Sequence, residues 1–203
     1  MSRIGVLALQ GDFFAHVSAL HRVGAQAREI RRCSELRELD GLVIPGGEST
    51  TLLNLMADEP WFEALREFHD RGGSLFGTCA GAILLARSVT GPEQPSLGLL
   101  DAKVERNAWG RQRESFEASL DAPAVGGSLD AVFIRAPRFR DLGREVEVLG
   151  RLHGEPVLVR QCRVLAGTFH PELTGDGRLH RYFVDIVAGA ECRVEPRVAA
   201  TSS

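Results

Sequence analysis

The first half of the sequence alternates short apolar runs with amphipathic stretches, and this alternation limits the folds that the chain can adopt. Apolar runs at residues 4–9, 41–44 and 74–76 predict buried strands. Amphipathic stretches predict helices at 13–23, from Ser49 or Thr50 onward, from Pro60 onward, and at 80–87. Strands that alternate with helices are typical of an α/β domain whose largely parallel sheet is covered on both faces.

The second half of the sequence has a different pattern, in which Gly and Pro turns separate short apolar runs. These runs predict strands that are partly antiparallel, at 97–104, 115–120, 131–134, 145–149, 157–160 and 164–169, followed by a helix at 178–188. We expect a single-domain, three-layer αβα sandwich of the flavodoxin-like type, with a mostly parallel central sheet, over residues 1–190. Residues 191–203 lack hydrophobic periodicity and are expected to form a disordered tail.

Composition excludes several classes of function. A formal net charge of −3 gives no electrostatic basis for binding nucleic acid or a membrane surface. No apolar stretch approaches the 18 or more residues needed to span a bilayer, so we expect a cytoplasmic protein. The four cysteines form no C-x-x-C pair and are expected to be reduced; they are Cys33, Cys79, Cys162 and Cys192. The histidine and cysteine spacings fit no metal site, and we predict no metal and no cofactor.

The segment Gly77-Thr78-Cys79-Ala80-Gly81 carries the strongest local signal. It lies between a predicted strand and a predicted helix, and matches the G-x-S-x-G nucleophile elbow with sulfur in place of oxygen. Side chains two residues before and after the nucleophile would collide in such a turn, hence the two glycines. The amide of Ala80 is positioned to stabilise an oxyanion. A buried cysteine beside glycines that serve only packing is the alternative reading.

A reactive cysteine needs a base, and His170 is the best placed of the six histidines. It follows the apolar run 164–169 and begins His170-Pro171-Glu172, so Glu172 can orient the imidazole. The remaining histidines are predicted to be solvated, capping or turn residues: His16, His21, His69 and His180 in helices, and His153 in a turn.

A third segment, residues 45–51, follows a strand and precedes a helix, where free backbone amides bind anions. It lacks the Gly-Lys-Ser/Thr ending of a Walker A loop. A purely structural role, with Ser49 or Thr50 as the N-cap of the following helix, would also explain this segment. Its two consecutive glycines favour instead a backbone amide of the Gly46-Gly47 turn that binds an oxyanion. The arginines near Trp109, namely Arg106, Arg111 and Arg113, are read as a solvated loop in which one arginine holds a substrate carboxylate.

With Cys79, His170 and Glu172 placed, the chain resembles the triad-type (class I) glutamine amidotransferases, and within them the glutaminases of pyridoxal 5′-phosphate synthase. The matching segments cover the chain to about residue 188. They are Leu9-Gln10-Gly11, Pro45-Gly46-Gly47-Glu48-Ser49-Thr50-Thr51, Phe76-Gly77-Thr78-Cys79-Ala80-Gly81, Val104-Glu105-Arg106-Asn107, Gly110-Arg111-Gln112, Ser115-Phe116-Glu117, Phe133-Ile134-Arg135-Ala136-Pro137 and Phe169-His170-Pro171-Glu172-Leu173-Thr174.

The resemblance implies hydrolysis of L-glutamine to L-glutamate and ammonia through a γ-glutamyl thioester on Cys79. It also implies a partner, a (β/α)₈ synthase subunit in a 12+12 complex, whose docking activates the glutaminase and which consumes the ammonia. By position, the residues that would bind glutamine are Gly47, Glu48, Ser49, Arg106, Ile134 and Arg135.

Three other functions stay open at this point. A triad amidotransferase of another pathway would supply its ammonia to a different acceptor. A cysteine peptidase or esterase on a similar sheet would act without a partner. A scaffold that only binds a synthase would form no thioester.

Overall fold

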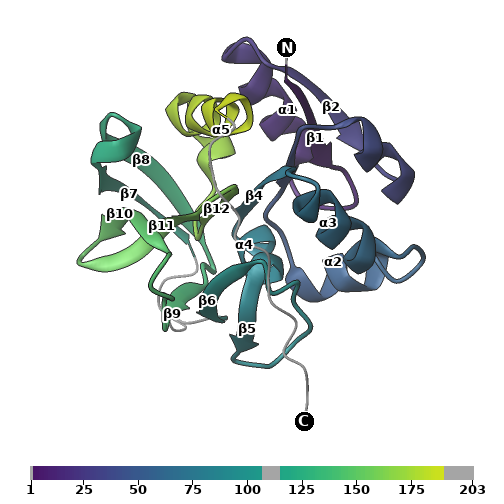
Figure 1. The fold of residues 1–203 in the computed structure, drawn as a ribbon. Helices are drawn as coiled ribbons and strands as arrows, with labels where there is room; N and C mark the ends of the chain where they lie inside the picture. The colour runs from purple at the N-terminus through teal and green to yellow at the C-terminus, as the bar shows by residue number, and fades with distance from the viewer. Residues whose placement is uncertain (1, 107–114, 190–203) are drawn as a thin grey trace.

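A sheet of nine strands runs through the molecule, and its two halves differ in strand direction (Figure 1). The computed structural model describes residues 2–106 and 115–189. The strand order is β2-β1-β3-β4-β12-β11-β10-β7-β8. The bounds are β1 (Arg3–Leu7), β2 (Gln26–Ile30), β3 (Gly41–Ile44), β4 (Ser74–Thr78), β7 (Ser115–Ala122), β8 (Gly127–Ile134), β10 (Glu147–Leu152), β11 (Glu155–Gln161) and β12 (Val164–Gly167).

The strands from β2 to β12 in this order pair in parallel, whereas those from β12 to β8 pair antiparallel. The parallel half comes mostly from the part of the sequence where apolar runs alternate with helices. The predicted α/β class, with an antiparallel second half, is therefore confirmed. Parallel strands β3, β4 and β12 direct their carboxyl ends to one edge, where open α/β sheets bind ligands.

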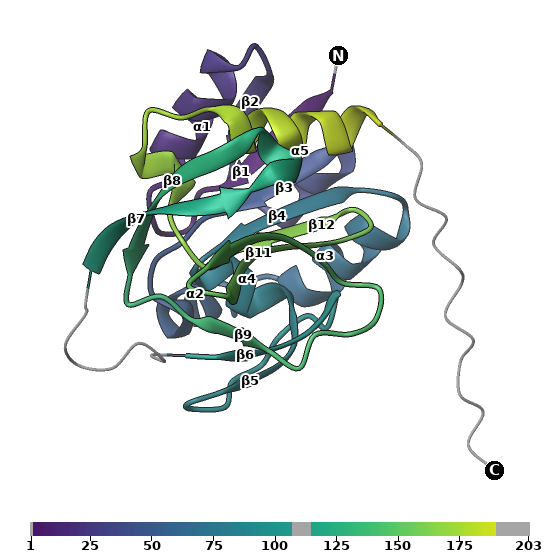
Figure 2. The same ribbon diagram turned by 90° about the vertical axis from the view of Figure 1, so that its left-hand side faces the viewer.

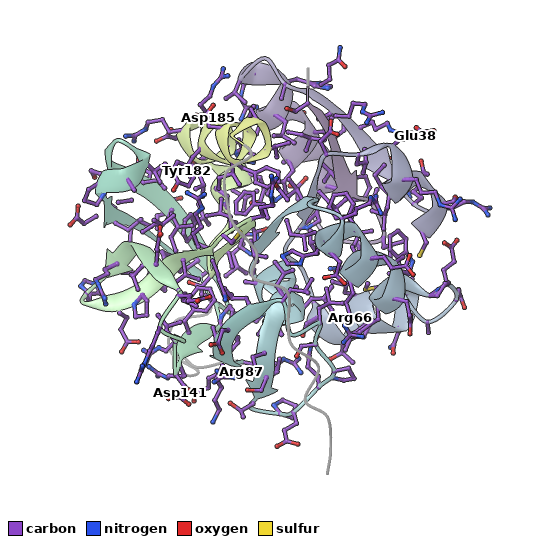
Figure 3. The ribbon with its side chains drawn as sticks, in the orientation of Figure 1. Glu38, Arg66, Arg87, Asp141, Tyr182 and Asp185 are labelled. Carbon is purple, nitrogen blue, oxygen red and sulfur yellow. The ribbon has the colours of Figure 1, made fainter. Side chains whose placement is uncertain are left out.

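Helices cover both faces of the sheet and enclose two separate apolar cores (Figure 2). On one face lie α1 (Phe13–Arg22) and α5 (Arg178–Ala188); on the other lie α2 (Ser49–Leu55), α3 (Trp61–Asp70) and α4 (Ala80–Leu85). Helix α3 illustrates the local reason: Trp61, Leu65 and Phe68 recur at helical spacing and are all buried. Charged side chains such as those of Glu38, Asp141 and Asp185 point outward (Figure 3).

A small second sheet packs beside α4 and corrects one prediction. Its strands are β5 (Ala86–Thr90), β6 (Leu100–Glu105) and β9 (Arg138–Arg140), in the order β5-β6-β9. The predicted helix 80–87 is wrong at its end, because Ala86 takes an extended conformation (φ −59°, ψ 155°) and pairs with Leu100. Tertiary pairing thus overrides the apolar pattern that continues through Leu84 and Leu85.

Three short 3-10 turns complete the described part: η1 (Cys33–Glu38), η2 (Pro123–Val125) and η3 (Pro171–Leu173). None of the helices within residues 2–106 and 115–189 combines the length and apolar character needed to cross a membrane. The predicted tail at 191–203 lies outside the described residues.

Candidate active site

Cys79 lies in the sharp turn between β4 and α4, as the elbow pattern predicts. Its backbone has φ 47° and ψ −102°, a conformation that a non-glycine residue adopts only where the surroundings impose it. A Cβ at Gly81 would lie 2.0 Å from the carbonyl oxygen of Ile44, and one at Gly77 would lie 2.5 Å from the backbone of Gly81. Both glycines are therefore needed to form the turn. Cys79 is a free thiol, 5% exposed.

His170 and Glu172 form a buried pair just after β12. The imidazole Nδ1 lies 2.8 Å from Oε1 of Glu172, and the His170 amide donates to the carbonyl of Val132 at 2.8 Å. Burial lowers the pKa of His170, but contacts with Cys79 and Glu172 outweigh it and raise the pKa to about 10. His170 therefore holds a proton at neutral pH, as a general acid must.

Gly46 brings the two reactive groups together. A Cβ at this position would lie 2.3 Å from Cε1 of His170 and 3.2 Å from Cβ of Cys79. The loop after β3 therefore packs against both Cys79 and His170, and only a glycine leaves room for both. The three predicted catalytic residues and the predicted oxyanion loop meet at the carboxyl ends of β3, β4 and β12.

The Gln10 side chain hydrogen-bonds to the loop that is predicted to supply an oxyanion amide. The sequence alone does not indicate this role. Oε1 of Gln10 accepts from the amide of Glu48 at 3.2 Å, and Nε2 donates to the carbonyl of Gly46 at 3.4 Å. Gly47, between Gly46 and Glu48, has φ 133°, a conformation that glycine adopts readily and other residues rarely do. Ala80, the other predicted oxyanion donor, is the first residue of α4.

Glu48 and Arg106 pair beside this loop. The Glu48 carboxylate accepts from the amides of Thr50 (3.1 Å) and Thr51 (2.7 Å), so Glu48 caps α2 in place of the predicted Ser49 or Thr50. Burial raises the pKa of Glu48, but these amide donors outweigh it and lower the pKa to about 2. Arg106 reaches the same carboxylate at 3.2 Å.

The remaining predicted glutamine-binding residues lie around Cys79. The carbonyl oxygen of Ile134 is 3.9 Å from Cys79 Sγ, and Arg135 follows with φ 43°. The Ser49 hydroxyl donates to Oε1 of Gln94 at 2.8 Å. Gln94 was not predicted, because a single polar residue in the 91–99 loop carries no sequence signal.

The other cysteines differ from the predictions in part. Cys33 is free, and burial together with Glu59 raises its pKa to about 12, so it is a poor nucleophile. Cys162 is disulfide-bonded, contrary to the expectation of reduced thiols, which rested on the absence of C-x-x-C pairs, a domain large enough to need no disulfide and the expected cytoplasmic location. Cys192 lies outside the described residues, as do Asn107, Trp109, Gly110, Arg111, Gln112 and Arg113.

Two histidines contradict the prediction of solvated or capping roles. His16 on α1 and His180 on α5 are both fully buried, at 0% exposure. His16 Nε2 lies 3.2 Å from Oε2 of Glu172, and His16 Nδ1 lies 3.0 Å from Nε2 of His180.

The fold and this cysteine–histidine–glutamate arrangement are those of a glutamine amidotransferase, and the chain belongs to the SNO glutamine amidotransferase family, whose sequence profile matches residues 6–189. A crystal structure of glutamine amidotransferase is 55% identical, with a TM-score of 0.86, and the match covers 91% of this chain and 98% of that one.

Two curated relatives have a more specific name than the family. The pyridoxal 5′-phosphate synthase subunit PdxT of Thermus thermophilus is 57% identical over 90% of this chain and 96% of its own length. The protein of the same name from Koribacter versatilis is 54% identical over 91% of this chain and 95% of its own.

Proposed function

We propose that this chain hydrolyses L-glutamine to L-glutamate and ammonia, with Cys79 as the nucleophile, and supplies the ammonia for pyridoxal 5′-phosphate synthesis. The glutaminase activity and its pathway follow from membership of the SNO family and from identities of 54–57% to the two subunits named above. One structural observation supports the residue assignment. Cys79 occupies a strained elbow, and Gly46 packs against both Cys79 and His170, which pairs with Glu172.

The residues supply each step of the reaction. The Cys79 thiolate attacks the side-chain amide carbon of glutamine, while backbone amides of Ala80 and the Gly46-Gly47 turn hold the oxyanion. Removing one such donor costs on the order of 10² to 10³ in rate. The carbon–nitrogen bond then breaks, His170 gives its proton to the departing nitrogen, and ammonia leaves a γ-glutamyl thioester.

Water completes the cycle. His170 takes a proton from the attacking water, the carbon–sulfur bond breaks, and glutamate leaves with the thiolate restored. Glu172 accepts a hydrogen bond from His170 Nδ1 at 2.8 Å throughout. It therefore stabilises the imidazolium and fixes the tautomer that presents Nε2 to the reaction.

The substrate pocket is assigned to the residues around this centre. Arg106, held by Glu48 at 3.2 Å, is the cation that would receive the glutamine α-carboxylate. Gly47, Ser49, Ile134 and Arg135 are assigned to the same pocket, because the loops that carry them border Cys79.

A synthase partner is implied for this chain, since the relatives are synthase subunits. We assign to that partner a (β/α)₈ fold and to the assembly twelve copies of each subunit. Ammonia released into water is lost by dilution and protonation, which favours a consumer docked at the site. Mass photometry of the mixed subunits tests the stoichiometry: a discrete 12+12 particle supports it, and a smaller one refutes it.

We assign residues 1–190 to one glutaminase domain and the protein to the cytoplasm. The family profile ends at residue 189, which supports the domain boundary. Cys79 must be a reduced thiol to act, and it is free in the structure although Cys162 is bonded. Limited proteolysis that removes residues 191–203 without loss of activity would support the boundary, and loss of folding would contradict it.

Glutamate and ammonia release, measured with and without the synthase subunit, tests the proposed function. Cys79→Ala should abolish release while the fold survives, and Cys33→Ala is the matched control that removes the other free thiol. Full release by Cys79→Ala would refute the assignment. Release from peptides or esters without a partner would point to a peptidase or esterase instead.

A further inference from the structure

A buried polar cluster lies behind Glu172, on the side away from His170. It contains His16 from α1, Thr78 from β4 and His180 from α5, all at 0% exposure. Three different elements therefore bring polar side chains to one point beneath the active site. Buried polar groups are costly unless they are hydrogen-bonded, so such a cluster calls for an explanation.

The two oxygens of the Glu172 carboxylate face two different histidines. Oε1 lies 2.8 Å from Nδ1 of His170, and Oε2 lies 3.2 Å from Nε2 of His16. The same His16 Nε2 is 3.3 Å from Thr78 Oγ1, and its N–H is better aligned with that hydroxyl. His16 Nε2 is thus the nearest donor atom to a carboxylate oxygen that has no hydrogen-bond partner among the described residues.

His180 determines which nitrogen of His16 carries the proton. His16 Nδ1 lies 3.0 Å from Nε2 of His180, while Nδ1 of His180 is buried with no partner in the described part of the chain. A buried N–H without an acceptor is rare in proteins. The His180 proton therefore belongs on Nε2, where it donates to His16 Nδ1, and the His16 proton must lie on Nε2, facing Glu172.

The neutral state of His180 agrees with this arrangement. Burial lowers the pKa of His180 to about 3, and His16 and Arg22 also lower it. Glu172 and Asp176 raise this pKa but do not outweigh the burial, so His180 is neutral. Burial raises the pKa of Glu172, but His16 and then His170 outweigh it and hold the pKa well below its usual range. Glu172 is the only carboxylate in direct contact with either His16 nitrogen among the described residues.

We propose that His16, with its tautomer set by His180, is a positioning residue that holds the Glu172 carboxylate ionised and directed at His170. The inference rests on the proposed glutaminase function. The polar contacts of His16 among the described residues are with Glu172, Thr78 and His180, none of which is assigned to the substrate pocket. Of these, Glu172 is the one that contacts His170. Loss of His16 should lower kcat and leave KM almost unchanged, since no substrate contact is removed.

Two variants separate positioning from packing. The amide of His16→Gln reaches the place of Nε2 and can still donate to Glu172, whereas the amide of His16→Asn reaches only the place of Nδ1. Both replace the ring by a buried amide, so a purely structural role predicts similar defects. We expect His16→Asn to lose about 10- to 100-fold in kcat, the usual effect of removing a residue that orients a functional side chain, and His16→Gln to retain most of the activity. The acid limb of the kcat profile should move to higher pH in His16→Asn.

Two further measurements do not depend on glutaminase activity. The first is the pH dependence of Cys79 alkylation by iodoacetamide, which should shift in His16→Asn and not in His16→Gln. The second is the ring ¹⁵N shifts of the unmodified chain, which should show His16 protonated on Nε2 and His180 on Nε2.

Equal kcat values and equal pH profiles in the two variants, whether at the wild-type level or equally reduced, would overturn the proposal, as would a proton on Nδ1 of His16. If wild type fails to hydrolyse glutamine with its synthase but the ¹⁵N and alkylation results hold, the proposed function fails and the positioning role stands.

Discussion

Gly46→Ala is the substitution whose effect the structure specifies most directly. The added Cβ would lie 2.3 Å from Cε1 of His170, whereas ordinary van der Waals contact begins near 3.4 Å. His170 or the loop must therefore move by about 1 Å, and a misplacement of that size can cost about 10²-fold in rate. Gly46 has no positive φ, so backbone strain does not add to the effect.

The assay is kcat for glutamate release by the chain in complex with its synthase subunit. We expect a loss of about 10²-fold, with overpacking costing about 1–3 kcal/mol of stability. Gly175→Ala is the matched control, because a Cβ there meets nothing within 4 Å and its φ is ordinary. An active Gly46→Ala with wild-type kcat would refute the close packing of Gly46 against His170 and Cys79.

Three further substitutions test other parts of the site. Glu172→Gln keeps the shape but removes the charge facing His170, and kcat measured with the synthase should fall by up to about 10⁴-fold; a loss under tenfold would contradict the role of Glu172. Arg106→Ala removes the proposed carboxylate partner, so KM for glutamine should rise about 10- to 100-fold, for a charged hydrogen bond of about 1.5–3 kcal/mol; an effect on kcat alone would contradict it. His180 has a pKa lowered to about 3 in the folded chain, against about 6.5 when unfolded, so the unfolded state binds the extra proton and stability falls with pH below about 6.5, by about 1.4 kcal/mol per unit. The difference in slope between wild type and His180→Phe, measured by urea unfolding between pH 6.5 and 5, isolates this contribution from that of His170, whose raised pKa acts in the opposite direction; equal slopes would contradict it.

The Cys79 elbow and the His170–Glu172 pair could be predicted from the sequence because each is formed by residues close together in the chain. The elbow needs glycine at 77 and 81, and the contacts of 2.5 and 2.0 Å at these positions show why. Glu172 stands two residues from His170, so their pairing needed no long-range information. The α/β alternation of the first half similarly reflects short-range periodicity.

The residues that the sequence did not reveal depend on contacts distant in the chain. His16 and His180 are separated by 164 positions, and a histidine in a helix carries no mark of which face it occupies. Strand β2 was missed because its alternating polar residues are half exposed at the edge of the sheet. Strand β5 begins at Ala86, where the sequence pattern predicted that the helix at 80–87 continues, because β5 pairs with β6.

The central claim is that Cys79 carries the γ-glutamyl thioester. The most direct test is to quench the active complex in acid during turnover of isotope-labelled glutamine and map the label by peptide mass spectrometry. We predict a glutamyl group on the Cys79 peptide, absent from Cys79→Ala and retained in Cys33→Ala. Labelled glutamate formed at the wild-type rate by Cys79→Ala, with no acylated Cys79 peptide in wild type, would contradict the account.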